Sequence, residues 1–503
     1  MELKPYINYI VKKKELDVEQ KFDVAIIGSG PGGYVAAIKA AQLGLRVAII
    51  EKEDVGGVCL NWGCIPTKTF LRSAEIIELV KKSSDFGIDI SEYNLNLQKI
   101  VERSKKIALK LSNGVKFLLS KNKVKLIHGN ARFIDKNRLL IQKSDSEQNL
   151  NISSNNIIIA TGAKPKEIPS LKVDGNVVWN YRNALRAKKI PNKLIIVGSG
   201  AIGMEFASFY NSLGTEVSVL EMQDRILPVE DLEVSQFAKK QFENKGIKFF
   251  LNSNFKVLEK NENQISIAVE SNNNKINLSA PHILVAIGVN GCTDGLGLDD
   301  IGINIKSNSI LINKYCQTNV KGIYAIGDVT TTPCLAHKAS YQGNIAAEAI
   351  SGKDVTKFLK EENIPGCTYS NPQIASIGLT EENAIKLGYD LNIGKNVISD
   401  FYTFNQFSKN DNAIKFFHDF LRDARFEQID DLLYQIAEER FDWFKEQENG
   451  LIDLVESGSS FFSLGSRSSN RFSRRISPPS RNRGFKKSGF YIAELTPGKP
   501  SFL

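Results

Sequence analysis

The stretch GGVCLNWGCIPTK, residues 56–68, places two cysteines with four residues between them, flanked by paired glycines and a Pro-Thr-Lys. Two thiols in the first turns of a helix can close a small disulfide ring, and the positive end of the helix dipole stabilises a thiolate. Gly56 and Gly57 let the backbone pass close to a flat ligand, which a side chain would prevent. The alternative interpretation of the two cysteines is a structural disulfide or a pair of buried free thiols. The particular flanking residues favour a redox-active pair, Cys59 and Cys64.

A glycine-rich turn precedes this pair. An apolar run at 22–27 leads into GSGPGG at 28–33, followed by an Ala-rich helical stretch and a second strand that ends at Glu51. Gly28, Gly30 and Gly33 let a helix N-terminus approach a pyrophosphate, and Glu51 can accept hydrogen bonds from ribose hydroxyls. A lone glycine pattern is weak evidence. With a strand, a helix and an acid 23 residues after Gly28, it predicts a dinucleotide-binding βαβ unit.

The same pattern returns about 170 residues later. A strand at 194–197 leads into GSGAIG, with glycines Gly198, Gly200 and Gly203, then a helix and a strand that ends at Glu221. Two such units predict two dinucleotides bound in one chain. Glu221 would repel a 2′-phosphate, so it favours NAD over NADP.

Further buried strands end in turns or acids. IIIATG at 157–162 is mirrored by ILVAIG at 283–288, and a strand from about 318 ends at Asp328, ahead of a helix expected at 336–350. We also expect an amphipathic helix at 92–120 and short strands near 123–133 and 138–142. These elements predict an α/β fold with two Rossmann-like domains. Asp328 alone could be only a helix cap.

Composition limits the function classes. Six cysteines in 503 residues, with one close pair, fit a reducing compartment rather than a disulfide scaffold. No apolar run approaches the roughly 20 residues of a membrane span, and residues 1–21 resemble no leader peptide, so a cytoplasmic protein is expected. The net charge of +9 comes from scattered lysines, which favours a solvated surface over a nucleic-acid site.

From about residue 22 to residue 394 the chain resembles the flavin- and pyridine-nucleotide-dependent disulfide oxidoreductases, and among them the dihydrolipoyl dehydrogenases. Glutathione reductases favour Lys at the position of Thr67 and use NADP, which Glu221 disfavours. Mercuric reductases carry a terminal cysteine pair, whereas no cysteine follows Cys367 here.

The resemblance implies FAD and NAD as cofactors and oxidation of dihydrolipoamide with NAD⁺ as acceptor. Cys64 would be the charge-transfer thiolate and Cys59 the interchange thiol. Lys68 would lie by the flavin and form an ion pair with Glu205. The alternative interpretation of Glu205 is a solvent-exposed acid on the surface of a helix. Asp328 would bind the ribityl chain. The other expected cofactor contacts are Ala131, Thr161, Gly162, Gly288, Cys334, Leu335, Ala336 and His337.

The expected domains are an FAD-binding domain (1–165 and 291–350), an NAD-binding domain (166–290) and a partial interface domain (351–410) that opens with a hairpin at 369–380. Residues 411–456 hold 13 acids and 5 bases with helical spacing and predict amphipathic helices. The Ser- and Arg-rich residues 457–503 predict a disordered tail. Such a tail could bind RNA or an acidic partner, but a solvated linker is favoured. A true fusion and a frame-shifted gene end also stay open as origins of residues 411–503.

The family's catalytic base is a His followed by Pro, with a Glu five residues later, and it reaches into the partner subunit. The four histidines are His128, His282, His337 and His418, and none precedes a proline. We read His418 as a helix-surface residue.

Two hypotheses follow. One is a dihydrolipoyl dehydrogenase acting on dihydrolipoamide carried by an acyltransferase or carrier protein of 2-oxo acid dehydrogenase complexes, with a weakened homodimer and slowed lipoamide turnover. The other is a catalytically impaired flavoprotein, a diaphorase with a C-terminal interaction module.

Overall fold

The structure is a computed structural model that describes residues 20–143, 149–355, 358–389 and 391. The predicted helices at 411–456, the predicted tail at 457–503 and His418 lie outside these residues. In the part of the chain that the structure describes, no helix is both long and apolar enough to cross a membrane.

The first sheet is built on the apolar runs of the first glycine-rich unit. Its parallel strands lie in the order β3-β2-β1-β6, and β19 adds to β6. An antiparallel arm, β5 and β4, continues from β6. Strand β2 is buried along its whole length, as expected for a parallel strand covered on both faces. The bounds are β1 (Gln20–Ile27), β2 (Val47–Glu51), β3 (Lys125–His128), β4 (Asn130–Asp135), β5 (Arg138–Gln142), β6 (Leu150–Ile159) and β19 (Ile323–Ala325).

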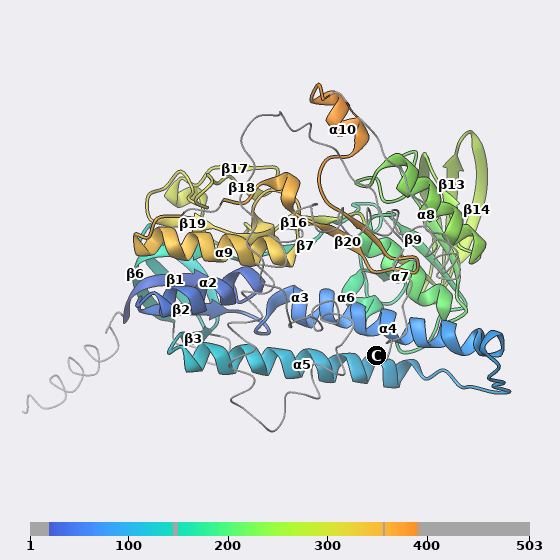
Figure 1. Ribbon diagram of the computed structural model, residues 1–503, viewed down its shortest axis with the longest axis horizontal. Coiled ribbons are helices and arrows are strands. Elements are labelled where there is room, and N and C mark those ends of the chain that lie inside the picture. The colour runs from blue at the N-terminus through green and yellow to red at the C-terminus, as the bar shows by residue number, and fades with distance from the viewer. Residues whose placement is uncertain (1–19, 144–148, 356–357, 390, 392–503) are drawn as a thin grey trace, which may run out of the picture. The chain divides into compact units, whose positions relative to one another are not determined.

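Helices α2 (Pro31–Gln42), α5 (Leu97–Lys121) and α9 (Ala336–Ser351) cover one face of this sheet (Figure 1). Val24 and Ile26 of β1 pack in one apolar cluster with side chains from all three helices. Helices α2 and α9 pack closely because glycines lie at their contact. A Cβ on Gly343 of α9 would lie only 2.7 Å from the carbonyl oxygen of Gly32 of α2. The expected helix at 92–120 is therefore α5, capped by the side chain of Asn96.

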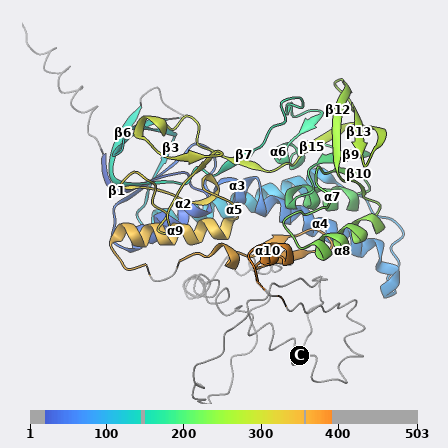
Figure 2. The ribbon, with the colours of Figure 1, turned by 90° about the horizontal axis from the view of Figure 1, so that it is seen from above.

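The second sheet repeats the arrangement of the first. Its strands are all parallel, in the order β11-β10-β9-β15-β8, and an antiparallel meander, β12-β13-β14, precedes β15 (Figure 2). The bounds are β8 (Val178–Trp179), β9 (Lys193–Val197), α7 (Ala201–Ser212), β10 (Glu216–Leu220), α8 (Leu232–Asn244), β11 (Lys248–Phe250), β12 (Ser253–Lys260), β13 (Ile265–Ser271), β14 (Asn274–Ala280) and β15 (His282–Val285).

Two short strands link the sheets. The chain leaves the first sheet through β7 (Ala163–Pro165) and returns through β16 (Val289–Gly291), and these two strands pair with each other. A discontinuous first domain, with the second sheet inserted into it, would require this path, and the domain bounds stay a prediction. The other short elements are α3 (Gly57–Asn61), α6 (Tyr181–Ala184), β17 (Ile305–Lys306) and β18 (Ser309–Ile310).

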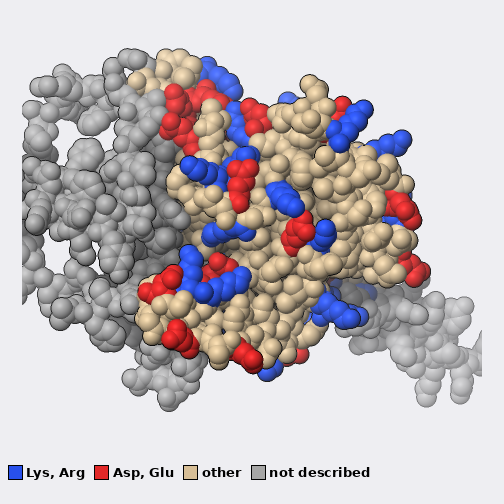
Figure 3. Space-filling model, turned by 90° about the vertical axis from the view of Figure 1, so that its right-hand side faces the viewer, with Lys and Arg blue, Asp and Glu red and all other residues tan. Residues whose placement is uncertain are grey.

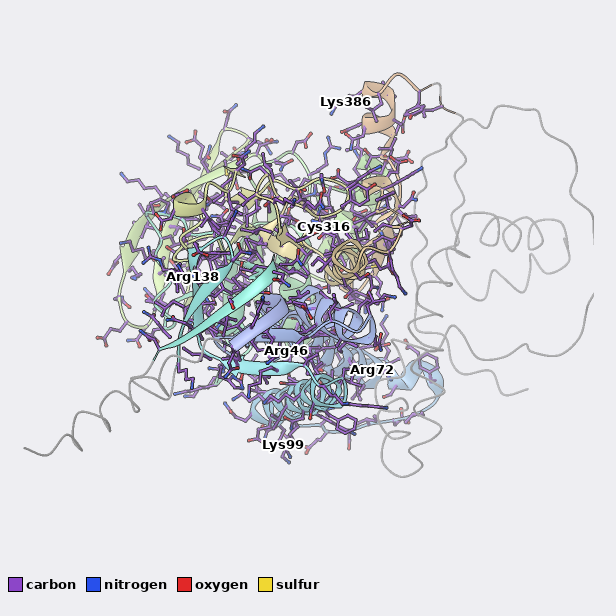
Figure 4. All side chains as sticks on the ribbon, turned by 90° about the vertical axis from the view of Figure 1, so that its left-hand side faces the viewer. Arg46, Arg72, Lys99, Arg138, Cys316 and Lys386 are labelled. Atoms are coloured by element: carbon purple, nitrogen blue, oxygen red, sulfur yellow. The ribbon has the colours of Figure 1, made fainter. Side chains whose placement is uncertain are left out.

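Helix α4 (Cys64–Lys81) connects the redox stretch to the second sheet. It packs beside α5, and Figure 4 labels Arg72 of α4 and Lys99 of α5 on these neighbouring helices. It also packs on α7, where the rings of Phe70 and Phe209 lie 4.6 Å apart between centroids. The N-terminus of α4, which carries Cys64, is thereby fixed between the two glycine-rich units.

The predicted hairpin is present as β20 (Gly366–Thr368) and β21 (Ile374–Ser376), followed by α10 (Glu381–Lys386). It lies against the second sheet's helix α7, where Asn371 N donates to Ser208 Oγ at 3.0 Å. On the face shown in Figure 3, Lys and Arg side chains are scattered and interspersed with Asp and Glu side chains, and the scattering of the basic residues is what the sequence predicted.

Candidate functional site

The two cysteines lie at the junction of two helices. Cys59 is in the short helix α3, and Cys64 is the first residue of α4. We expected both in the first turns of one helix, but Gly63 leaves helical geometry and separates them. Gly57 is required at its position, because it has a φ of 59° and a Cβ there would lie 2.7 Å from the Cα of Gly30. The redox stretch thus packs directly on the first glycine-rich turn.

The two sulfurs differ in acidity. Both are thiols in the structure. The pKa of Cys64 is lowered, first because its sulfur accepts a hydrogen bond from Cys59 and second because the Lys68 ammonium is near. The pKa of Cys59 is raised well above its ordinary value, because it donates that bond and is buried. These opposite shifts, together with the place of Cys64 at the N-terminus of α4, favour Cys64 as the thiolate of a reduced pair and Cys59 as the neutral thiol.

The expected ion pair between Lys68 and Glu205 is present. Lys68 Nζ lies 2.8 Å from Glu205 Oε1, and the side chains are 20% and 7% exposed. Lys68 comes four residues after Cys64 on α4, whereas Glu205 comes from α7. The pair joins the redox helix to the helix of the second glycine-rich unit.

The first glycine-rich turn has the shape of a pyrophosphate cradle. A Cβ on Gly28 or Gly33 would lie within 2.3 Å of a carbonyl oxygen, whereas a Cβ on Gly30 would meet nothing within 4 Å. Gly30 supplies no side-chain cap to α2, and Pro31 has no N–H, so the backbone N–H groups of Gly32 and Gly33 are the first-turn donors available to an anion. These residues fit a dinucleotide phosphate.

The Glu51 carboxylate is held at the end of β2. It accepts hydrogen bonds from Ser29 N at 2.8 Å, Ser29 Oγ at 2.6 Å and Glu53 N at 2.8 Å. Strand β3 pairs His128 with Glu51, and Ala131 is buried in the strand that follows. Gly129 N, just before β4, donates to Glu51 O at 2.9 Å, which brings the start of the strand that carries Ala131 close to the end of β2, where the sequence predicted a ribose site.

Asp328 is half-buried just after β19, and burial raises its pKa. Among the described residues no group donates a hydrogen bond to its carboxylate, so it can accept one from a ligand hydroxyl. Thr161 Oγ1 donates to Cys292 O at 2.8 Å and the Gly162 carbonyl accepts from Cys292 N at 2.9 Å, which fixes the end of β6. These positions fit the sugar-alcohol chain of FAD.

The segment Cys334–His337 leads into α9. Leu335 is its N-cap residue and makes no side-chain capping bond, so the N–H groups of the first turn, before Ala339, are available to a ligand. His337 Nε2 lies 3.0 Å from Pro365 O, and burial raises the pKa of Cys334 to about 11. Cys334 is therefore a neutral thiol, and the helix N-terminus is the part of this segment suited to a polar edge of the flavin.

The second glycine-rich turn repeats the first in detail. A Cβ on Gly203 would lie 2.0 Å from Gly198 O, and a Cβ on Gly200 would meet nothing within 4 Å. Glu221 accepts from Ser199 N at 2.9 Å, Ser199 Oγ at 2.7 Å and Gln223 N at 3.0 Å. The turn at Gly288, with a φ of 101°, ends β15 as Gly162 ends β6.

Sequence reasoning missed three residues at these sites. Ser29 and Ser199 orient the two acids, and their shared place in the repeated GSG turns could have revealed them. Tyr369 was placed in the hairpin but not at the redox centre, where its N–H donates to Glu205 Oε1 at 2.9 Å. Nothing local in the sequence indicates that contact.

Comparisons with known proteins agree with this geometry. The model of the family described as pyridine nucleotide-disulphide oxidoreductase matches residues 22–343, and the model of that family's dimerisation domain matches residues 364–419. The latter match extends past residue 394, where we expected the resemblance to fade.

Curated relatives include the dihydrolipoyl dehydrogenase of Zymomonas mobilis, 45% identical over 74% of this chain and 80% of the relative. That of Rhizobium etli is 42% identical over 75% of this chain and 81% of the relative.

Among solved structures, LpdA from Mycobacterium tuberculosis has a TM-score of 0.67 at 28% identity, covering 74% of this chain and 80% of that one. The flavoprotein disulfide reductase RclA from Escherichia coli has a TM-score of 0.64 at 27% identity, with the same coverage. The chain therefore belongs to the pyridine nucleotide-disulphide oxidoreductases, FAD-dependent oxidoreductases that use NAD(H) and have two dinucleotide-binding domains and a dimerisation domain.

Proposed function

We propose that this protein is a dihydrolipoyl dehydrogenase, which oxidises dihydrolipoamide with NAD⁺ through the Cys59–Cys64 disulfide. The observation that carries the proposal is the redox pair at the N-terminus of α4, backed by the Lys68–Glu205 ion pair. The names of the curated relatives support this substrate over the alternative of an impaired diaphorase.

The thiol exchange assigns a separate task to each cysteine. A thiolate of dihydrolipoamide attacks Cys59 Sγ, the Cys59–Cys64 bond breaks, and Cys64 leaves as the thiolate that its lowered pKa favours. The second substrate thiol attacks the lipoyl sulfur of the mixed disulfide. Lipoamide closes, and Cys59 Sγ is released as the thiol that its raised pKa favours.

Electrons and protons balance over the two half-reactions. When bound, FAD supplies the two-electron relay between the dithiol and the nicotinamide. The Cys59 thiol and the Cys64 thiolate return to the disulfide, giving up two electrons and one proton, and NAD⁺ takes both as a hydride. One of the two substrate protons is released to solvent.

The residues assigned to FAD are the first glycine turn, Glu51, Asp328 and the N-terminus of α9. The residues assigned to NAD are the second glycine turn and Glu221. The acid at each strand end is held by a serine and a backbone N–H, which leaves its outer lone pairs for ribose hydroxyls.

The lipoyl partner and the oligomer are part of the proposal. We propose that the substrate is presented on an acyltransferase or carrier protein of a 2-oxo acid dehydrogenase complex. The match of residues 364–419 to a dimerisation domain supports a homodimer, and its mass in solution would test this.

The test compares two activities of one preparation. NAD⁺-dependent oxidation of dihydrolipoamide should depend on both cysteines, whereas NADH-dependent reduction of a quinone or dye should survive in Cys59→Ser, because it needs only the reduced flavin. Since none of the four histidines precedes a proline, we expect lipoamide turnover to be lowered by at least the factor that a general base contributes, about 10²–10⁴, while dye reduction needs no such base. Dye reduction with no cysteine-dependent lipoamide turnover would favour the diaphorase instead.

A further inference from the structure

The hairpin β20–β21 reaches the redox centre within the same chain. Tyr369, just after β20, donates its backbone N–H to Glu205 Oε1 at 2.9 Å. The same oxygen lies 2.8 Å from Lys68 Nζ. Glu205 Oε1 thus accepts two hydrogen bonds, one from Lys68 of α4 and one from Tyr369 of the hairpin.

The Tyr369 ring is a second partner for Lys68. Lys68 Nζ lies 4.4 Å from the centroid of that ring, within the distance at which an ammonium is attracted to an aromatic face. The Tyr369 hydroxyl donates to the sulfur of Cys367, two residues earlier in the hairpin. The ring is therefore held at both of its ends, by its backbone on Glu205 and by its hydroxyl on Cys367.

Lys68 links this contact to the thiolate. Cys64 and Lys68 are four residues apart on α4, so they lie on one face of the helix. Among the described residues, the titratable groups that act on Cys64 and its neighbour Lys68 are Cys59 of α3, Glu205 of α7, and Cys367 and Tyr369 of the hairpin. Lys68 is the cation of this set.

We propose that Tyr369 is a positioning residue, which holds the Lys68 ammonium between its ring and the Glu205 carboxylate so that the ammonium stays beside Cys64. The hairpin that opens the dimerisation domain thereby helps to set the charge of the redox pair. This inference rests on the proposed role of Cys64 as the charge-transfer thiolate.

The experiment titrates the thiolate directly. The holoprotein is reduced by two electrons, and the long-wavelength absorbance band of a thiolate against oxidised flavin is followed with pH. Tyr369→Leu keeps the backbone N–H but removes the ring face, so Lys68 is held less well. We expect the midpoint of the band to rise by about half a unit to one unit, about a threefold to tenfold fall in the ratio of thiolate to thiol.

Two milder variants separate the parts of the contact. Tyr369→Phe and Cys367→Ala each remove the hydroxyl–sulfur bond but keep an aromatic face at 369, so each should shift the midpoint less than Tyr369→Leu. Tyr315→Leu is the matched control, because Lys314 Nζ lies 5.1 Å from the Tyr315 ring centroid in a loop of the first domain. It should leave the midpoint unchanged.

The outcomes are distinct. If the unmutated protein shows no long-wavelength band, the proposed role of Cys64 fails. If it shows the band and Tyr369→Leu, with full FAD content, titrates at the same midpoint, the inference about Tyr369 is overturned. An equal shift of the midpoint in Tyr315→Leu would also overturn it, because the shift would then not depend on the contact between Tyr369 and Lys68.

Discussion

Glu221 should decide which nicotinamide dinucleotide the protein uses. Glu221 is 9% exposed, and its carboxylate is fixed by Ser199 and Gln223 at the end of β10. A 2′-phosphate in place of the ribose hydroxyl would put a negative charge roughly 5 Å from it. At an effective dielectric of about 20 this repulsion costs about 3 kcal/mol per unit charge, or about a hundredfold in binding.

The assay measures kcat/KM for NADH and for NADPH in dye reduction. We expect NADH to be preferred by about a hundredfold or more, with little dependence on salt because the carboxylate is buried. Glu221→Gln removes the charge, so the preference should fall to within about tenfold. Activity with both dinucleotides should also fall, because the amide NH₂ meets N–H donors where the carboxylate accepted.

Glu51→Gln is the matched control, since Glu51 is held by the same pattern of bonds in the first unit. It should weaken FAD retention and leave the ratio of NADH to NADPH unchanged. Equal rates with NADH and NADPH in the unmutated protein, or an unchanged preference in Glu221→Gln, would refute the reasoning.

Three further results are expected. Cys64→Ser should abolish the long-wavelength band of the two-electron-reduced protein, and Cys59→Ser should retain it; the reverse, seen by absorbance, would exchange the two roles. Because the pKa of Cys64 is lowered, the band should persist below the pH at which an ordinary thiolate takes up its proton and disappear as pH falls through that lowered pKa; a band that is lost as pH rises would contradict this. Tyr210→Phe should lower the free energy of unfolding by about 1–3 kcal/mol, because the buried Tyr210 hydroxyl donates to Ala184 O at 2.7 Å; denaturant unfolding checks it, and no change would mean that the carbonyl finds another donor.

Local sequence patterns determined most of the cofactor architecture. The glycine turns were readable because their backbone needs residues without a Cβ, as at Gly28 and Gly198, both with a φ of 103°. Glu51 and Glu221 could be predicted because a parallel strand brings the residue at its carboxyl end to the sheet edge where the helix N-terminus lies. The redox pair was readable because the flanking residues of Cys59 and Cys64 lie within one short stretch of chain.

Only the tertiary structure decided how these parts meet. Lys68 and Glu205 are 137 residues apart, and Tyr369 is a further 164 residues from Glu205. No local pattern encodes such contacts, since they depend on the packing of α4 on α7 and of the hairpin on α7. The same packing makes the pKa values of the two thiols differ. The hydrogen bond from Cys59 to Cys64 and the nearby Lys68 ammonium cause this difference, and both exist only in the folded chain.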